Sequence, residues 1–181
     1  MNKVLLMGQA NVGKSVFFNR LAGANVTVSN YPGTSVDFDK GRMLFQGEYV
    51  DLIDVPGTFS LQPKDRAEEV AVKMLEEEKD TVVICVIDAS KVERGLYLAL
   101  EIMEKGYPVI VALNMWDIAN NANVKIDARK LEQILGVPVV PTVATRGEGF
   151  KELVARMREV MPVKIEEIMK SVGSGKSGTH N

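Results

Sequence analysis

The sequence is poor in cysteine, in histidine and in long apolar runs, and each shortage excludes a class of protein. Its single cysteine, Cys85, cannot form an internal disulfide, and its place in the apolar run TVVICVID favours packing in the core. No stretch reaches the ~20 apolar residues that a bilayer-spanning helix needs. The N-terminal apolar stretch is too short for a signal peptide. The chain as given is therefore expected to be soluble, alone or as a piece of a membrane protein.

Charge of one sign is also scarce. The 22 Lys and Arg residues nearly balance the 24 Asp and Glu residues, so no basic field predicts a nucleic-acid partner. The lone His180 lies in the C-terminal stretch GSGKSGTHN, which is typical of a flexible tail, and no His, Cys and Asp residues are spaced as iron ligands. A length of 181 residues favours one domain with a proper core.

Short apolar runs alternate with helical patterns along the chain. Strands are predicted at 3–8, 41–46, 48–55, 81–88, 108–114 and 137–143, and helices at 14–22, 66–78, 92–105, 127–136 and 150–161. The polar residues 24–38 predict a long loop, and Gly47 predicts a hairpin. This order favours an α/β fold with a mostly parallel sheet, one antiparallel edge hairpin and helices on both faces. Ligands of such folds bind at the carboxyl ends of the strands.

The stretch GQANVGKS, from Gly8 to Ser15, lies between the first strand and the first helix. This is the spacing and context of the phosphate-binding loop of P-loop NTPases, in which backbone N–H groups and a helix N-terminus hold phosphate oxygens. Lys14 is expected to reach the β- and γ-phosphates, and Ser15 to ligate Mg²⁺. The predicted phosphate-binding residues are Gly8, Gln9, Ala10, Asn11, Val12, Gly13, Lys14, Ser15 and Val16.

Two further stretches are placed to meet the γ-phosphate. In DVPG, Asp54 ends a strand and can hold Mg²⁺, and the backbone N–H of Gly57 can approach the phosphate because glycine has no side chain. The loop VSNYPGTSVDF offers the hydroxyls of Thr34 and Ser35. Either hydroxyl can complete the coordination of Mg²⁺ only in the triphosphate state, which is the physical basis of a switch.

The stretch NMWD, from Asn114 to Asp117, is expected to choose the base. The carboxylate of Asp117 can accept two hydrogen bonds from guanine, whereas adenine would leave it unpaired. The predicted ligand is therefore GTP or GDP. Asn114 is expected to tie this loop to the phosphate loop, and Met115 to lie along the base where the usual motif has lysine. An alternative role for Asp117, compatible with the first, is the N-cap of a helix.

The stretch VATRGEG follows the last strand, where backbone N–H groups can meet the carbonyl of guanine. Val143, Ala144 and Thr145 are the candidates, and Ala144 and Thr145 are preferred. The motif is weak alone, but its order and spacing after the other three support it.

These motifs together resemble the N-terminal G domain of the FeoB ferrous-iron transporter family, within the TrmE-Era-like P-loop GTPases. The resemblance covers about residues 1–162 and rests on NYPG, DVPGTFSL, ALNMWDIA and VPVVPTVATRGEG. It implies a GTP-binding regulatory domain at the cytoplasmic face of a cell membrane, in a longer chain that carries the transmembrane iron-permease domain. It also implies that 163–172 begins a truncated helical segment, followed by the tail 173–181.

The resemblance implies metal ligands as well. Members usually carry N-W/Y-P-G-V-T, so the Mg²⁺-binding threonine of the family falls on Ser35 of NYPGTS, and Thr34 is the alternative. The family is potassium-activated through an asparagine of the phosphate loop, and Asn11 occupies that place; the alternative is that Asn11 only shapes a turn. The residues expected to act in hydrolysis are Lys14, Asn11 and Gly57.

Hydrolysis is expected to be slow, because Thr58 stands where Ras-type enzymes place a water-orienting glutamine. The charged stretch KDRAEEVAVKML predicts a solvated helix face, with a partner-docking surface as the alternative. Two other functions fit less well. A soluble Era-like GTPase of ribosome assembly or tRNA modification would need an RNA-binding module, and an ATP-driven metabolic kinase would need a substrate lid. The oligomeric state stays open.

Overall fold

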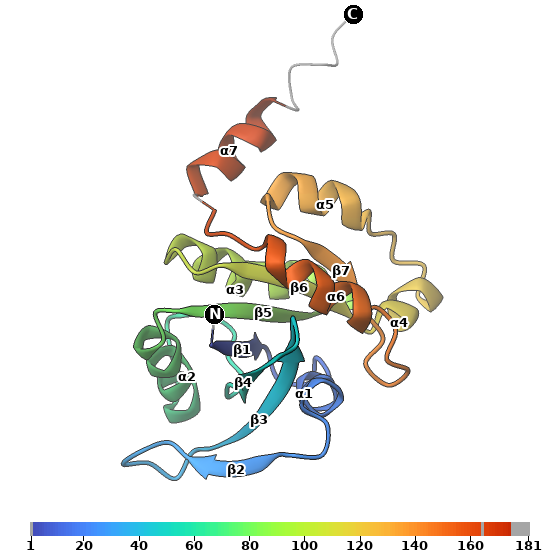
Figure 1. Ribbon diagram of the computed structural model, residues 1–181. Helices are drawn as coiled ribbons and strands as arrows, with labels where there is room; N and C mark the ends of the chain where they lie inside the picture. Colours follow the sequence, from blue (N-terminus) through green and yellow to red (C-terminus); the bar gives the residue numbers. More distant parts are fainter. Residues whose placement is uncertain (1, 164, 175–181) are drawn as a thin grey trace, which may run out of the picture.

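The computed structural model describes residues 2–163 and 165–174 and contains a seven-stranded sheet with helices on both faces (Figure 1). The strands are, in spatial order, β2 (Thr27–Asn30), β3 (Asp37–Phe45), β4 (Glu48–Asp54), β1 (Lys3–Gly8), β5 (Thr81–Asp88), β6 (Val109–Asn114) and β7 (Val139–Pro141). Strands β4, β1, β5, β6 and β7 run parallel, whereas β3 is antiparallel to both β2 and β4. The predicted α/β class and mostly parallel sheet are confirmed.

The antiparallel edge is larger than predicted. Residues 24–38 were expected to form a loop throughout, but Thr27–Asn30 form β2 and extend the β3–β4 hairpin by a third strand. The stretch TVSN shows no buried face, because β2 is paired on one side only and its side chains are largely exposed. Its sequence therefore lacks the apolar alternation by which a half-buried strand is recognised.

The helices are α1 (Lys14–Ala22), α2 (Arg66–Glu77), α3 (Val92–Glu104), α4 (Trp116–Asn121), α5 (Ala128–Leu135), α6 (Phe150–Arg156) and α7 (Ile165–Ser174), with 3₁₀ turns at Ala89–Lys91 and Met157–Glu159. Helix α4 begins after Met115, so Asp117 lies in its first turn and the predicted N-cap role is wrong. Helix α7 contacts α5 and α3. Gly173 and Ser174, the first two residues of the predicted tail 173–181, are instead the last residues of α7, and the rest of the tail lies outside the described residues. Within the described ranges, no helix is both long and apolar enough to cross a bilayer.

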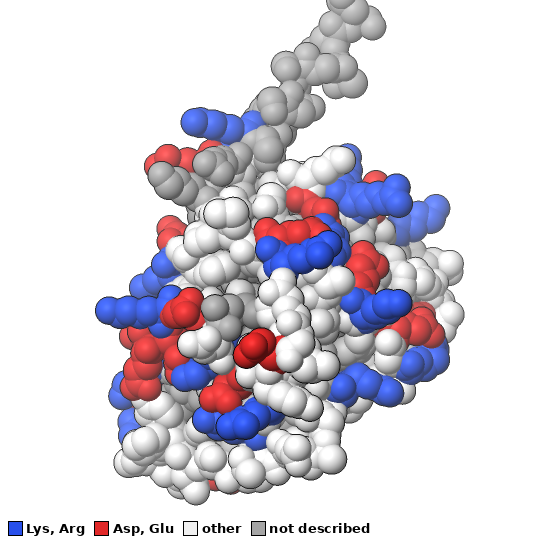
Figure 2. All heavy atoms as spheres, in the orientation of Figure 1, with Lys and Arg blue, Asp and Glu red and all other residues white. Residues whose placement is uncertain are grey.

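Two apolar layers hold the helices onto the sheet. One layer joins α1 and α6 to the sheet, with Phe17 and Phe150 in ring contact at 4.4 Å between centroids. The other layer joins α2, α3 and α5 to the opposite face and includes Cys85. Burial raises the pKa of the Cys85 thiol to about 12, which agrees with the predicted packing role. On the face visible in Figure 2, cationic and anionic side chains are interspersed, so no field of one sign covers it.

Helix α3 lies directly on β5 because Gly95 has no side chain. A Cβ atom at this position would lie 2.4 Å from Cγ2 of Ile87, far inside van der Waals contact. The helix backbone is thereby held close to the carboxyl end of the parallel strands.

An ion pair joins the elements around β7. The guanidinium of Arg156 on α6 donates to both carboxylate oxygens of Glu132 on α5, at 2.8 and 2.7 Å. One of these oxygens also accepts a hydrogen bond from the backbone N–H of Val139, at 3.0 Å. These contacts lower the pKa of Glu132, chiefly through the hydrogen bonds from Arg156. The pair fixes the strand that leads into the stretch VATRGEG.

Candidate functional site

The phosphate loop joins β1 to α1, as predicted. Gly13, the residue before α1, has a φ of 80°, and a Cβ atom there would lie 2.6 Å from Nδ2 of Asn114. Only glycine meets both conditions without strain. The same hypothetical Cβ would lie 3.5 Å from the terminal methyl of Met115, so the Met115 side chain lies along the phosphate loop.

Lys14, Ser15 and Asp54 come together at the start of α1. Lys14 Nζ contacts a carboxylate oxygen of Asp54 and donates a hydrogen bond to the carbonyl of Val55 at 2.6 Å. Ser15 Oγ lies 3.4 Å from the other Asp54 oxygen. Burial raises the pKa of Asp54, although the positive charge of Lys14 acts in the opposite direction. A hydroxyl and a carboxylate at this separation are the hard oxygen donors that Mg²⁺ prefers, so these residues fit the predicted metal.

The stretch after β4 passes directly beside the phosphate loop. A Cβ atom on Gly57 would lie 3.2 Å from the backbone nitrogen of Ala10, and the N–H of Thr58 donates to the Gly8 carbonyl at 3.1 Å. The side chain of Thr58 is fully buried, and its hydroxyl donates to the Ser60 carbonyl at 2.7 Å. The Thr58 side chain therefore points into the protein interior.

Two glutamates hold the loop between β4 and α2, and sequence reasoning missed both. Glu68 accepts hydrogen bonds from the backbone N–H groups of Phe59 and Lys64, at 3.0 and 2.8 Å. Glu101 on α3 accepts from the N–H of Leu61 at 2.7 Å. Glu68 is only 5% exposed, so the prediction that the charges of this stretch form a solvated face is wrong for Glu68. The exposed pair Arg66–Glu69 does match it.

A sequence signal for Glu68 existed. Asp65 is the N-cap of α2 and accepts a hydrogen bond from the Glu68 N–H at 2.9 Å. An acceptor at the N-cap followed three residues later by Glu is the pattern in which the Glu side chain reaches back over the helix start. No such local signal exists for Glu101, because its partner is 40 residues away.

The phosphate loop is also tied to α3. The side-chain amide of Gln9 donates to the backbone carbonyl of Arg94 at 2.7 Å. Gln9 is 9% exposed, so this hydrogen bond is shielded from water. The Gln9 side chain thus anchors the phosphate loop to α3 and does not face solvent.

The loop 31–36 folds back on itself and leans on α2. The hydroxyl of Thr34 donates to the Tyr31 carbonyl at 2.9 Å and accepts from the N–H of Val36 at 3.1 Å, whereas Ser35 is exposed. The phenol of Tyr31 donates to Glu77, at the end of α2, at 2.5 Å. Across the described residues, no hydrogen bond or ion pair joins this loop to Ser15. The structure therefore does not bring Thr34 and Ser35 to the predicted Mg²⁺ position, and their role stays a prediction.

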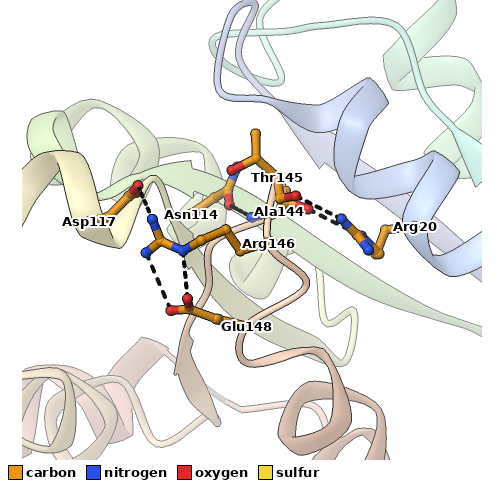
Figure 3. Close-up of polar contacts among 7 residues, drawn as sticks. All are labelled: Arg20, Asn114, Asp117, Ala144, Thr145, Arg146 and Glu148. Atoms are coloured by element: carbon orange, nitrogen blue, oxygen red, sulfur yellow. Dashed lines mark hydrogen bonds and ion pairs between the residues drawn. The ribbon is translucent and has the colours of Figure 1, made fainter.

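Asn114 connects the base loop to two other parts of the site, as Figure 3 shows for Ala144. Its amide nitrogen donates to the carbonyl of Val12 at 2.9 Å. Its amide oxygen accepts from the N–H of Ala144 at 3.0 Å and from the Thr142 hydroxyl at 3.3 Å. The predicted tie between Asn114 and the phosphate loop is present, and Asn114 also fixes the stretch VATRGEG.

Asp117 faces a residue that sequence reasoning did not single out. Nη1 of Arg146 donates to Oδ2 of Asp117 at 3.1 Å, while Nε donates to Glu148 at 2.6 Å (Figure 3). The two carboxylates raise the pKa of Arg146, with the hydrogen bond to Glu148 as the largest cause. Arg146 thus has a second anionic partner when Asp117 binds another group.

A glycine-rich loop between a strand and a helix, with Lys14, Asp54 and an Asn114-centred base loop around it, defines a P-loop nucleotide-binding domain of the GTPase type. The family model described as ferrous iron transport protein B matches residues 2–157. The chain belongs to that family, FeoB.

Curated relatives agree with this assignment. The Fe(2+) transporter FeoB of Salmonella typhimurium is 42% identical over 152 residues, which cover 82% of this chain and 20% of the relative. The same transporter of Escherichia coli K12 is 40% identical over 152 residues, with the same coverage. The chain thus spans about a fifth of the length of the curated relatives it matches.

Solved structures of the same family share the fold. The cytosolic domain of the T. maritima FeoB iron transporter, in its GMPPNP form, gives a TM-score of 0.84 at 35% identity and covers 100% of this chain and 76% of that chain. A mutant of S. thermophilus NFeoB bound to GDP gives a TM-score of 0.82 at 34% identity and covers 90% of this chain and 63% of that chain. The chain therefore has the fold of the FeoB G domain.

Proposed function

We propose that this chain binds GTP and GDP, hydrolyses GTP slowly, and regulates a ferrous-iron transporter of which it forms one part. The observation that carries the proposal is the double tie of Asn114, which holds the phosphate loop at Val12 and the guanine loop at Ala144. One side chain thereby sets the distance between the phosphate end and the base end of the site. The guanine nucleotides of the similar solved structures support the same ligand class.

Base selection rests on the carboxylate of Asp117. Guanine offers it two N–H donors, whereas adenine offers no matching pair. On guanine binding, Arg146 can shift its donors toward Glu148, which it already contacts at 2.6 Å. The N–H of Ala144 is engaged with Asn114 at 3.0 Å, so we assign the N–H of Thr145 to the guanine carbonyl.

Phosphate binding uses the backbone of Gly8–Val16 and the ammonium of Lys14, which would exchange Asp54 for phosphate oxygens. Ser15 and Asp54 would hold Mg²⁺, which when bound neutralises charge on the β- and γ-phosphates. Asn11, exposed and with a φ of 64°, offers an amide oxygen for K⁺, which when bound supplies positive charge where other GTPases use arginine.

Hydrolysis has few protein groups to assist it, which supports a slow rate. The N–H of Gly57 and the ammonium of Lys14 can stabilise charge on the transferred phosphoryl group. The Thr58 side chain is fully buried and its hydroxyl donates to the Ser60 carbonyl, so we do not assign it the attacking water. Positioning of water would then fall to the backbone of the loop 31–36 once it has moved to the nucleotide.

The cellular setting follows from the family. The remaining four fifths of a FeoB-length chain would hold the iron-permease domain, and this part would lie at the cytoplasmic face of the membrane. The G domain would comprise residues 1–162, and residues 163–172, which include most of α7, would be the start of a helical segment that packs on α5 and α3. Ferrous iron is the cargo of the permease and is not assigned a site in this domain. No nucleic-acid partner is proposed.

The experiment that tests the proposal measures GTP turnover by the purified protein, with Mg²⁺, in potassium chloride and in sodium chloride at matched ionic strength. Potassium is expected to stimulate turnover on the order of tenfold or more, because it replaces a charge-stabilising group. The Asn11→Ala variant should lose this stimulation, while Asn25→Ala, at an exposed asparagine outside the phosphate loop, should keep it. Equal rates in both salts would refute the potassium site, and an absence of GTP binding would refute the function itself.

A further inference from the structure

Arg20, in the last turn of α1, donates hydrogen bonds to the loop that contains the Thr145 N–H, which we assigned to the guanine carbonyl. Its Nε donates to the carbonyl of Ala144 at 3.2 Å, and its Nη2 donates to the carbonyl of Thr145 at 2.8 Å. Figure 3 shows the guanidinium directed at these two backbone oxygens from the α1 side. The rigid fork of an arginine suits two successive acceptors, a geometry that the single ammonium of lysine does not reproduce.

Arg20 helps to set the direction of one particular N–H group, together with the backbone N–H of Gly147, which also donates to the Ala144 carbonyl, at 3.3 Å. A trans peptide is planar, and its N–H points opposite to its carbonyl. Because the Ala144 carbonyl faces Arg20, the N–H of Thr145 in the same peptide points away from α1. The N–H of Ala144 is held separately by Asn114 at 3.0 Å, so both peptides around Ala144 are fixed.

The absence of a side chain at Gly147 leaves room for the Arg20 guanidinium beside the loop. Gly147 has a φ of 73°, and a Cβ atom there would lie 3.3 Å from Nη1 of Arg20. A side chain at this position would therefore be both strained and crowded against the arginine. Arg146 has a different task, since its guanidinium contacts Asp117 and Glu148 on the other side of the loop.

Helix α1 thus reaches both ends of the nucleotide site. Lys14 and Ser15 lie in its first turn, beside the phosphate loop, and Arg20 lies in its last turn, at the guanine loop. We infer that Arg20 is a positioning residue for guanine recognition: it aims the N–H of Thr145 at the carbonyl oxygen of the base. This inference rests on the proposed function and adds to it a residue that contacts neither the base nor the phosphates.

The test measures dissociation rates and dissociation constants of GDP and of inosine diphosphate, with inorganic tripolyphosphate as a probe that has no base. Both nucleotides carry the carbonyl that Thr145 would meet, and only GDP carries the exocyclic amine that Asp117 would meet. Arg20→Ala should speed the dissociation of both nucleotides by the same factor, roughly tenfold, because one oriented hydrogen bond is lost. Tripolyphosphate binding should not change.

Two variants serve as controls. Arg20→Lys retains the charge but not the fork, and should fall between wild type and Arg20→Ala. Arg158→Ala removes an exposed arginine of the Met157–Glu159 turn and should match wild type. A thermal unfolding curve of each variant separates loss of fold from loss of positioning, and Arg20→Lys carries the test if Arg20→Ala unfolds.

Two results would overturn the role of Arg20. One is a GDP dissociation rate in both Arg20 variants within twofold of wild type. The other is an equal loss of tripolyphosphate binding, which would mean that Arg20 supports α1 as a whole. Failure of the wild-type protein to bind GDP would instead refute the proposed function, and this inference with it.

Discussion

Nδ2 of Asn114 lies 2.9 Å from the carbonyl oxygen of Val12, and this hydrogen bond makes the base loop and the phosphate loop one unit. Asn114 is 2% exposed, so water does not compete for the bond. A nucleotide that fits one loop must therefore fit the other without adjustment between them.

The first prediction concerns the identity of the base. Asp117→Asn replaces an acceptor by an amide that can also donate, and it should weaken GDP binding roughly 100-fold through the loss of two charge-assisted hydrogen bonds. Xanthosine diphosphate, which presents a carbonyl where guanine has an amine, should gain affinity. Competition binding of the two nucleotides provides the measurement. Unchanged GDP affinity would remove Asp117 from base recognition.

The second prediction separates Ser35 from Thr34. Ser35→Ala should weaken the binding of a non-hydrolysable GTP analogue in Mg²⁺ roughly tenfold while GDP binding stays constant, because only the triphosphate state would use this hydroxyl. Thr34→Ala should change both nucleotides equally, since its hydroxyl is committed to Tyr31 and Val36. Ser35→Thr is the matched control and should bind normally. The reverse pattern would assign the ligand to Thr34.

The third prediction concerns the effect of pH on Asp54. Burial raises its pKa above 3.8 in the fold, so the folded protein holds this proton more tightly than the unfolded chain. Protonated Asp54 stabilises the fold relative to the ionised form. This contribution is complete below the pKa of Asp54 in the unfolded chain, and it is lost as the pH rises through the higher pKa of Asp54 in the folded protein. Asp54→Asn should therefore raise the Tm of the nucleotide-free protein by a few degrees near neutral pH.

The stabilising effect of Asp54→Asn should shrink as the pH approaches 3.8, where the wild-type carboxyl is itself protonated. Thermal unfolding of both proteins across this range gives the measurement. Asp51→Asn, at a partly exposed carboxylate paired with Lys40, is the control and should not show the same gain. A lower Tm at neutral pH would show that the Lys14–Asp54 pair stabilises the empty site on balance. In either case Mg²⁺ binding should suffer.

The fourth prediction concerns the ion pair at β7. Glu132→Gln should lower the free energy of unfolding by about 1–2 kcal/mol, because two hydrogen bonds from Arg156 lose their charge assistance. The wild-type pKa of Glu132 is lowered, so its contribution is present above the unfolded value of 4.5 and disappears as pH falls through the folded value. Urea unfolding at neutral and acidic pH tests both statements. Glu152→Gln, at an exposed carboxylate 3.9 Å from Arg156, should have little effect at either pH.

The parts of the site that could be predicted are those that local sequence determines. The phosphate loop, Asp54 and Asn114 each lie at the carboxyl end of a recognisable strand, and parallel strands bring these ends to one edge of the sheet. The order of the motifs along the chain therefore indicated their meeting in space. The tie from Asn114 to the phosphate loop was expected from the guanine motif, and the structure has it at the carbonyl of Val12.

The parts that could not be predicted depend on long-range contacts or on loop backbone. Arg20 reaches a loop more than a hundred residues away, and Glu101 holds an N–H of a distant loop, so no spacing rule points to either. The 31–36 loop leans on Glu77 through Tyr31, which the composition of the loop does not indicate. Strand β2 was missed because an exposed edge strand has no apolar face to show.

The absence of a side chain at Gly95 affects how variants of this protein should be interpreted. Gly95 allows helix α3 to pack closely on Ile87. The same helix contains two hydrogen-bond acceptors for neighbouring loops. The Arg94 carbonyl accepts from the side-chain amide of Gln9, and the Glu101 carboxylate accepts from the backbone N–H of Leu61. Any bulkier residue at 95 lifts that helix and moves both anchor points together. In a mutational screen such a change would look like a defect of nucleotide chemistry, although the altered position contacts no nucleotide and is a spacer between a helix and a strand.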